Sequence, residues 1–398
     1  MTLLVGCGGR SGQNSEDTAG AGSGGTGGSS GGASSARGGA SSVGGAAALD
    51  CQDLSGALGP GSFELVFDSP ALRIPLLVPR DDGALVAHRD GGIVVIELDG
   101  SVTPVSLEPF DRAFEGEWHR SILSPRGNAL LATQSSRTAI LNFASGEVAV
   151  FEPADSPHVL NFDFSNSGNL VITLFGLIVP ERQFEHLLQV RRLNGEVISN
   201  QPPRKRLPLI PATDDTLIWR EDKELVATDF DGAETFRFAP GGIVDYVFAS
   251  TDGRSLLVES GTTVTLMYPA LGLVKPSVEL GNAARYRALS SSGTYVVLSP
   301  DQPAIIQQLY LGALQAQLTT GIVDYSSLDV NDDGNILAAG LAADQRPLVE
   351  LLTWDGGLLF SCFSQPMNAG PLDVGFTRDG RAYALFRDRL LVFNVPKR

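Results

Sequence analysis

The chain has 398 residues, of which 43% are hydrophobic and 19% charged, so it can bury a substantial core and is not a wholly disordered chain. No run approaches the roughly 18 apolar residues of a membrane span, and the sequence predicts no transmembrane helix. The net charge of −16 disfavours nucleic acid as a partner, and three Cys and four His leave little material for a metal cluster.

The first seven residues end in Leu4-Val5-Gly6-Cys7. This segment resembles the lipobox of bacterial lipoproteins, in which a small residue precedes the Cys that becomes lipidated. The resemblance implies an exported protein that Cys7 anchors to the outer membrane or cell surface of a bacterium. A signal peptide has a basic start and roughly 7–15 apolar residues, whereas only six residues precede Cys7. Two alternatives follow: the true start lies upstream, or the match is accidental.

Residues 8–50 are dominated by Gly, Ser and Ala and contain almost no large apolar side chain. Such a segment cannot bury enough surface to offset the entropy lost on ordering. We therefore expect a flexible tether between the lipobox, residues 1–7, and a single domain, residues 51–398. The alternative is an ordinary disordered tail.

A Gly-centred turn recurs between short apolar runs about every 42 residues in the rest of the chain. The clear copies of this first turn contain Gly83, Gly127, Gly168, Gly253, Gly293, Gly334 and Gly380. A degenerate copy, Thr213-Asp214-Asp215-Thr216, lacks the Gly. A second turn follows in each of the first seven units, at Asp99-Gly100, Ser145-Gly146, Asn194-Gly195, Asp231-Gly232, Leu271-Gly272, Leu311-Gly312 and Asp355-Gly356. Each unit therefore contains two hairpin turns, in which Gly adopts the positive φ that tight hairpins need.

Short runs of aliphatic and β-branched residues flank these turns and predict strands. Examples are Ala84–Ala87, Ile93–Ile96, Ser255–Val258 and Leu390–Phe393. Only a short stretch near Glu181–Leu188 is compatible with a helix. Four short strands repeated every 40–45 residues are typical of a β-propeller blade. The sequence therefore predicts an all-β propeller.

The last unit lacks a fourth strand, whereas an additional strand-like run, Ser62–Phe67, precedes the first unit. We expect this run to complete the last blade and close the ring, which removes an open sheet edge. Eight first turns then predict eight four-stranded blades, with seven as the alternative if the degenerate unit is misread. The turns Ser124-Pro125-Arg126-Gly127 and Ser250-Thr251-Asp252-Gly253 resemble those of WD40-like and TolB-type propeller repeats, a resemblance that covers residues 62–398.

Two cysteines remain besides Cys7. Cys51 lies just before the closing strand, and Cys362 lies in the outer strand of the seventh unit. In an exported domain such a pair indicates a disulfide, which here would staple the ring closure. The alternative is two unpaired thiols.

Catalytic and metal-binding motifs are poorly represented. Asp329, Asn331 and Asp333 fit the first half of a D-x-[DN]-x-[DN]-G calcium loop, but Gly340 stands where that loop needs an acidic ligand. We interpret this segment as a structural turn, with a metal site as the weaker alternative. The sequence has no G-x-S-x-G or H-E-x-x-H motif, and its turns lack the Trp of quinoprotein propellers, so we expect no cofactor.

Candidate binding residues lie in connections that a propeller places on one face. They are Phe114, Trp118 and His119 in the connection after the first unit, and the basic cluster of Arg204, Lys205 and Arg206. Aromatic side chains in loops can anchor an interface, and a basic cluster in an acidic chain can bind an anionic partner. The alternatives are core packing for the aromatic residues and a solvated linker for the basic ones.

The function that fits these features best is a non-catalytic, lipid-anchored platform at the cell envelope that binds a protein or a glycan. In gross plan the chain resembles the eight-bladed lipoprotein adaptors of outer-membrane protein assembly, an analogy of fold alone. We expect a monomer that contacts the membrane only through its lipid anchor. The alternative function is a lactonase- or hydrolase-like propeller enzyme with a metal on the central axis.

Overall fold

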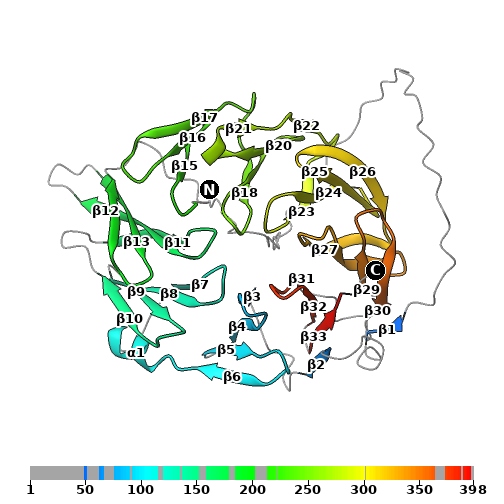
Figure 1. Ribbon diagram of the computed structural model, residues 1–398, viewed down its shortest axis with the longest axis horizontal. Helices are drawn as coiled ribbons and strands as arrows, with labels where there is room; N and C mark the ends of the chain where they lie inside the picture. Colours follow the sequence, from blue (N-terminus) through cyan, green and yellow to red (C-terminus); the bar gives the residue numbers. More distant parts are fainter. Residues whose placement is uncertain are drawn as a thin grey trace, which may run out of the picture.

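The computed structural model describes residues 49–51, 62–66, 76–89, 92–114, 120–134, 137–151, 158–178, 184–201, 213–221, 223–300, 302–363, 373–386 and 389–395. These residues form eight sheets that follow one another around a ring, with one edge strand of each sheet nearest the centre (Figure 1). The chain is therefore an eight-bladed β-propeller, as the sequence predicts. None of the helices in the described ranges has the length and hydropathy of a membrane span.

Blades 1–4 follow the chain from the inner strand to the outer one. Blades 1 and 2 contain β3 (Leu76–Pro79), β4 (Leu85–Arg89), β5 (Gly92–Ile96) and β6 (Val102–Val105), then β7 (Arg120–Leu123), β8 (Ala129–Gln134), β9 (Arg137–Asn142) and β10 (Val148–Phe151). Blades 3 and 4 contain β11 (His158–Phe164), β12 (Leu170–Ile178), β13 (Phe184–Arg192) and β14 (Val197–Gln201), then β15 (Leu217–Glu221), β16 (Glu224–Thr228) and β17 (Glu234–Phe238). The degenerate fourth unit thus forms a blade of its own, so the seven-bladed alternative is wrong.

Blades 5–8 complete the ring. Blades 5 and 6 contain β18 (Tyr246–Ala249), β19 (Leu256–Ser260), β20 (Thr263–Tyr268), β21 (Leu273–Val274) and β22 (Val278–Glu279), then β23 (Ala284–Leu289), β24 (Tyr295–Pro300), β25 (Ile305–Tyr310) and β26 (Ala313–Thr319). Blades 7 and 8 contain β27 (Ile322–Val330), β28 (Ile336–Ala342), β29 (Pro347–Leu352), β30 (Leu358–Phe363) and β1 (Leu49–Asp50), then β31 (Asp373–Phe376), β32 (Arg381–Leu385), β33 (Arg389–Asn394) and β2 (Phe63–Val66).

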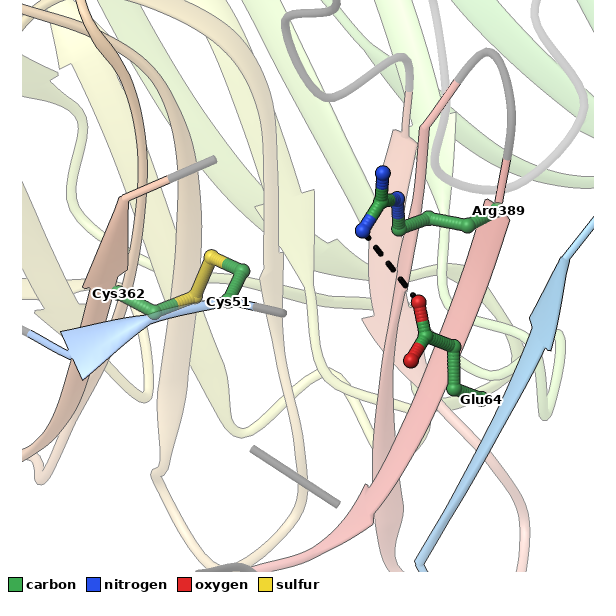
Figure 2. The surroundings of a disulfide bond; sticks show 4 residues. All are labelled: Cys51, Glu64, Cys362 and Arg389. Carbon is green, nitrogen blue, oxygen red and sulfur yellow. Dashed lines mark hydrogen bonds and ion pairs between the residues drawn. A yellow bond between two sulfur atoms is a disulfide. The ribbon is translucent and has the colours of Figure 1, made fainter. Parts of the chain in front are cut away.

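The N-terminal part of the domain closes the ring at two places. Strand β2 pairs antiparallel with β33, which confirms the closing strand, and Glu64 of β2 forms an ion pair with Arg389 (3.3 Å). Strand β1 adds in parallel to the outer edge of β30. A disulfide joins Cys51, directly after β1, to Cys362 of β30, the pairing that the sequence suggests (Figure 2). The closure is therefore held by backbone pairing, an ion pair and a covalent bond.

The hairpin turns have the backbone conformations that their sequences predict. In blade 5 the N–H of Gly253 donates to the carbonyl of Ser250 (2.8 Å), and the Ser250 hydroxyl accepts from the N–H of Ser255 (3.1 Å). The glycines of all seven clear first turns and all seven second turns have positive φ. Because successive strands run in opposite directions, both kinds of turn lie at the same end of the blades. We call this end the turn face and the opposite end the loop face.

The core consists of apolar clusters between neighbouring blades. Leu257 and Leu266 of blade 5, for example, pack with Val296 and Leu298 of blade 6. Because each blade packs in this way on both sides, its second strand is largely apolar and buried, as in β8 and β28. One such cluster lies at each junction between neighbouring blades.

One helix departs from the sequence-based expectation. Helix α1 (Glu108–Phe114) lies between blades 1 and 2 and buries Phe110 and Phe114. The stretch expected to tolerate a helix, Glu181–Leu188, instead contributes residues 184–188 to strand β13. Pairing with β12 along the whole length of β13 explains the difference, because tertiary pairing overrides weak local preference.

Gly340 marks a point of close backbone approach in blade 7. A Cβ atom there would lie 2.1 Å from the carbonyl oxygen of Asp324 and 2.6 Å from Cγ2 of Ile322. We expect Gly340→Ala to lower the free energy of unfolding by about 2–3 kcal/mol, measured by urea denaturation. Gly92→Ala is the matched control, because nothing lies within 4 Å of its added Cβ. Equal unfolding midpoints for the two variants would contradict this account of Gly340.

Candidate interaction surface

The second turns of the ring carry polar residues in most blades and leucine in two neighbouring ones. The residue before the Gly is Asp99, Ser145, Asn194, Asp231 or Asp355 in five of the turns. In blades 5 and 6 it is Leu271 and Leu311, whose exposed fractions are 76% and 40%. Exposed leucine at positions that favour Asp or Asn is a departure from the local turn chemistry.

The Leu311 turn holds this residue in an unfavourable conformation. Tyr310 pairs with Ala313, so Leu311 and Gly312 alone connect β25 to β26. Their φ angles are 49° and 81°, the positive values of a type I′ hairpin turn. A leucine in this left-handed region costs roughly 1 kcal/mol, which Asn largely avoids. The side chain is nevertheless exposed, so burial in this chain does not offset the cost.

We therefore expect Leu311→Asn to raise the free energy of unfolding by about 1 kcal/mol. The same substitution at Leu314, which is similarly exposed but lies within β26 rather than at a positive φ, should give no gain. Thermal or urea unfolding of both variants measures the difference. A Leu311→Asn variant less stable than the parent protein would contradict the strain argument.

The Leu271 turn presents a second apolar projection. The short 3-10 helix Pro269–Leu271 ends at Gly272, whose φ is 60°, and Leu273 then pairs with Tyr268. Both Leu271 and Leu273 are exposed, whereas Tyr268 is half-buried. Burial, together with the nearby carboxylate of Asp252, raises the pKa of Tyr268. Leu271 and Leu273 thus project exposed apolar side chains from this side of blade 5.

Contacts between blades join these projections into one strip. A Cβ added at Gly312 would lie 2.8 Å from Cβ of Lys275, which places the second turn of blade 6 against the outer segment of blade 5. On its other side the ring of Tyr310 lies 5.3 Å from that of Tyr295, which in turn lies 4.7 Å from Trp354 in the second turn of blade 7. The exposed members of this strip, which we call the apolar rim, are Leu271, Leu273, Tyr310, Leu311 and Leu314.

Polar groups nearer the axis, by contrast, serve contacts between blades. Asp332 of blade 7 accepts hydrogen bonds from the N–H (2.9 Å) and hydroxyl (2.7 Å) of Ser292 in blade 6. Asp81 of blade 1 lies 3.5 Å from the guanidinium of Arg126 in blade 2 and 3.7 Å from that of Arg378 in blade 8. The inner part of the turn face is therefore structural, whereas the apolar rim presents large side chains to solvent.

Of the residues expected to form a binding face, only Phe114 lies within the described residues. Phe114 is 1% exposed, and its ring lies 5.4 Å from that of Phe110 in an edge-to-face contact. It belongs to the core between blades 1 and 2, and its assignment as a binding-face residue is corrected accordingly. Trp118, His119 and the basic cluster at 204–206 lie outside the described residues, as does Cys7.

The half-motif for calcium forms an ordinary turn. Asp329 accepts hydrogen bonds from the N–H groups of Val330 (2.9 Å) and Phe376 (3.0 Å). Asn331 accepts from the N–H groups of Asp333 (3.1 Å) and Asn335 (2.8 Å). These oxygens therefore bind backbone rather than converge on a common point. Across the described ranges, no group of three or more His, Cys, Asp or Glu side chains is placed to hold a metal ion.

Comparison with known proteins identifies the fold. No protein-family model matches the sequence, and no curated protein matches it. Among solved structures, the C-terminal WD40 domain of Sif2 matches at 13% identity and a TM-score of 0.52, over 82% of this chain and 99% of that chain. BamB from Moraxella catarrhalis matches at 14% identity and a TM-score of 0.50, over 84% of this chain and 98% of that chain. The chain is thus a β-propeller similar to these two.

Proposed function

We propose that this protein is a non-catalytic platform that binds a protein partner through the apolar rim. The observation that carries the proposal is the run of exposed Leu and Tyr side chains across neighbouring second turns of blades 5 and 6. Contiguous exposed apolar surface on a soluble domain is characteristic of interaction sites. At Leu311 this surface is kept at a cost in backbone conformation, and residues held in such conformations are common at functional sites.

The composition of the rim favours a protein over a glycan. Leu271, Leu273, Leu311 and Leu314 offer aliphatic surface, which gains affinity by burying apolar groups of a partner. Tyr310 adds an aromatic ring with a polar tip, the kind of residue that often anchors protein interfaces. A sugar would instead need a convergent set of hydrogen-bonding groups, which these leucines do not supply.

We further propose that the platform is lipid-anchored at the cell envelope. Support comes from the lipobox-like segment ending at Cys7 and the Gly- and Ser-rich residues that follow it. The Cys51–Cys362 disulfide also fits a protein that matures in an oxidising compartment. Mass spectrometry of the mature protein tests this part separately, because an N-terminal diacylglyceryl Cys7 would support it and an unmodified Cys7 would oppose it.

The partner proposal is tested with a variant that carries Leu271→Asp and Leu311→Asn. The second change is expected to stabilise the fold, so weaker binding cannot be ascribed to unfolding. The tagged protein and this variant are incubated with envelope extract of the producing organism, and copurifying proteins are quantified. We expect a protein that is recovered at least about tenfold less with the variant, as the loss of a hot spot would give.

Val150→Asp in blade 2 is the matched control, because Val150 is also an exposed residue of an outer strand. It should leave recovery of that protein unchanged. Equal recovery with the parent, the rim variant and the control would overturn the assignment of the rim.

A further inference from the structure

The N-terminal part of the described chain is attached to the ring at two separate places. Strand β1 lies on blade 7 and strand β2 on blade 8, and Figure 2 shows the disulfide of the first place apart from the ion pair of the second. Along the chain β1 comes first, Cys51 follows directly, and β2 comes later. A pull on the residues that precede β1 therefore acts on blade 7 before it acts on blade 8.

The backbone pairing of β1 is too short to resist such a pull alone. Leu49 pairs with Cys362 and Asp50 with Phe363, and the N–H of Cys51 donates to the carbonyl of Phe363 (2.8 Å). Each backbone hydrogen bond adds little net free energy, because water replaces it once the strands part. A strand held by so few bonds separates readily when its end is pulled.

Strand β2, which closes the ring, is also attached through few contacts. It pairs with β33 through four residues, Phe63–Val66, and lies at the edge of its sheet in the described structure. The ion pair between Glu64 and Arg389 and the partly buried side chains of Phe63 and Leu65 hold it further. An edge strand with few buried contacts can open while the rest of the fold stays intact. A pull that reached β2 would therefore open blade 8.

Strand β30, to which the disulfide leads, is by contrast held by a sheet and by the core. It pairs with β29 along its whole length of six residues, whereas β1 has only two paired residues. Cys362 is 1% exposed and belongs to the apolar cluster between blades 7 and 8, together with Val349 of β29 and Phe393 of β33. A pull applied at Cys362 is therefore shared between strand pairing and core packing.

The disulfide determines which of these attachments bears the pull. With the bond intact, the shortest covalent path from the N-terminal segment into the domain runs through Cys51 and Cys362 into β30. Strand β2 lies within the loop that the bond closes, so the backbone does not carry the tension to it. Without the bond, the covalent path follows the backbone through β2 and on to blade 1. The bond thus decides whether the closing strand is under tension.

We propose that the Cys51–Cys362 disulfide is a mechanical clamp that receives a pull on the N-terminal segment at blade 7 and keeps it from the closing strand β2. The place of the bond supports this role. A disulfide between β2 and β33 would also close the ring, but it would direct the pull into blade 8 itself. The inference goes beyond the proposed binding function and requires only that the N-terminal segment be held, whether by a lipid or by another molecule.

Single-molecule force measurements on the full chain test the proposal. In a Cys7→Ser background, one handle is attached at the N-terminus and the other at Gln315, an exposed residue of β26 in blade 6. A constant pull is applied to the folded, oxidised chain and to the variant with Cys51→Ala and Cys362→Ala. We expect this variant to open at least about a hundredfold faster at the same force, because noncovalent contacts alone then bear the pull. Equal opening rates would overturn the proposal.

A second pulling geometry separates the clamp from a general loss of stability. With handles at Val150 of blade 2 and Gln315 of blade 6, both in exposed positions, the pull does not enter through the N-terminal segment. The ratio of opening rates between the double variant and the parent should then be at least about tenfold smaller than in the first geometry. Equal ratios in the two geometries would mean that the bond only adds stability, and the clamp would be refuted.

The single variant Cys51→Ala provides a check that leaves β30 unaltered. It breaks the same bond, whereas Cys362 keeps its place in the core. Under the N-terminal pull it should open as fast as the double variant, because its covalent path also runs through β2. A single variant that resists this pull for as long as the parent would likewise contradict the proposal.

Discussion

Replacing Arg287 with methionine is expected to lower the free energy of unfolding by about 3–5 kcal/mol. Arg287 of blade 6 forms an ion pair with Glu259 of blade 5, and the two side chains are only 8% and 2% exposed. The guanidinium also lies over the rings of Tyr246 (4.5 Å) and Phe248 (5.2 Å). Met preserves much of the apolar volume but leaves a buried carboxylate without its counter-charge.

The remaining contact of Glu259 cannot replace that charge. Its other carboxylate oxygen accepts a hydrogen bond from the backbone N–H of Ala284 (3.2 Å), which also lies at the boundary between blades 5 and 6. The double variant Arg287→Met with Glu259→Gln should therefore recover a substantial part of the loss. Urea denaturation of the parent, the single variant and the double variant measures both effects. A double variant that is destabilised by the sum of its single changes would contradict the pairing argument.

Removing the disulfide with Cys51→Ala and Cys362→Ala is expected to lower the free energy of unfolding by about 2–5 kcal/mol. The two cysteines are 311 residues apart, so the bond restricts almost the whole unfolded domain. Both are buried at 1% exposure, and the bond also holds β1 on the edge of β30. Alanine is chosen because a serine hydroxyl would add a buried polar group.

The losses of unfolding free energy caused by the two cysteine substitutions should not add up. This distinguishes loss of the disulfide from the loss that two independent cavities would cause. Each single variant already breaks the bond, so each should show most of the loss found in the double variant. Reduction of the parent protein should lower its unfolding midpoint, whereas the double variant should be insensitive to the reductant. A double variant with the midpoint of the oxidised parent would contradict a stabilising role for this bond.

Much of the architecture could be predicted because one physical signal is repeated along the chain. Each first turn needs a residue with positive φ, and Gly recurs there at a nearly constant spacing, as at Gly253 and Gly293. The missing fourth strand of the last unit predicts closure by residues 62–67, and β2 pairs with β33 accordingly. The eight-bladed ring could be predicted from the sequence because neighbouring units repeat the same strand pattern.

Helix α1 carries local signals in the sequence that are typical of a helix. Its Pro109 lies in the first turn, Glu108 and Arg112 form an ion pair four residues apart (3.1 Å), and Phe110 and Phe114 lie on one face. These are ordinary helix signals, and they explain why the aromatic side chain of Phe114 points into the core. Phe114 was instead expected on a binding face because it lies in the connection between two units.

The apolar rim could be predicted only in part. Leu271-Gly272 and Leu311-Gly312 are visible in the sequence as second turns that lack the usual polar residue. Whether these leucines are exposed depends on how neighbouring blades pack, which a local sequence pattern does not reveal. The contact between Gly312 and Lys275, which joins the two turns into one strip, likewise arises from the ring as a whole.

Site-specific photocrosslinking in the producing cells tests most directly whether the apolar rim binds a partner. A photoreactive amino acid is introduced in place of Leu271, Leu311 or, as the control, Val150 of blade 2. The account predicts that the two rim positions link to the same protein and that the control position does not. Identical adducts from all three positions, or adducts from the control position alone, would contradict it.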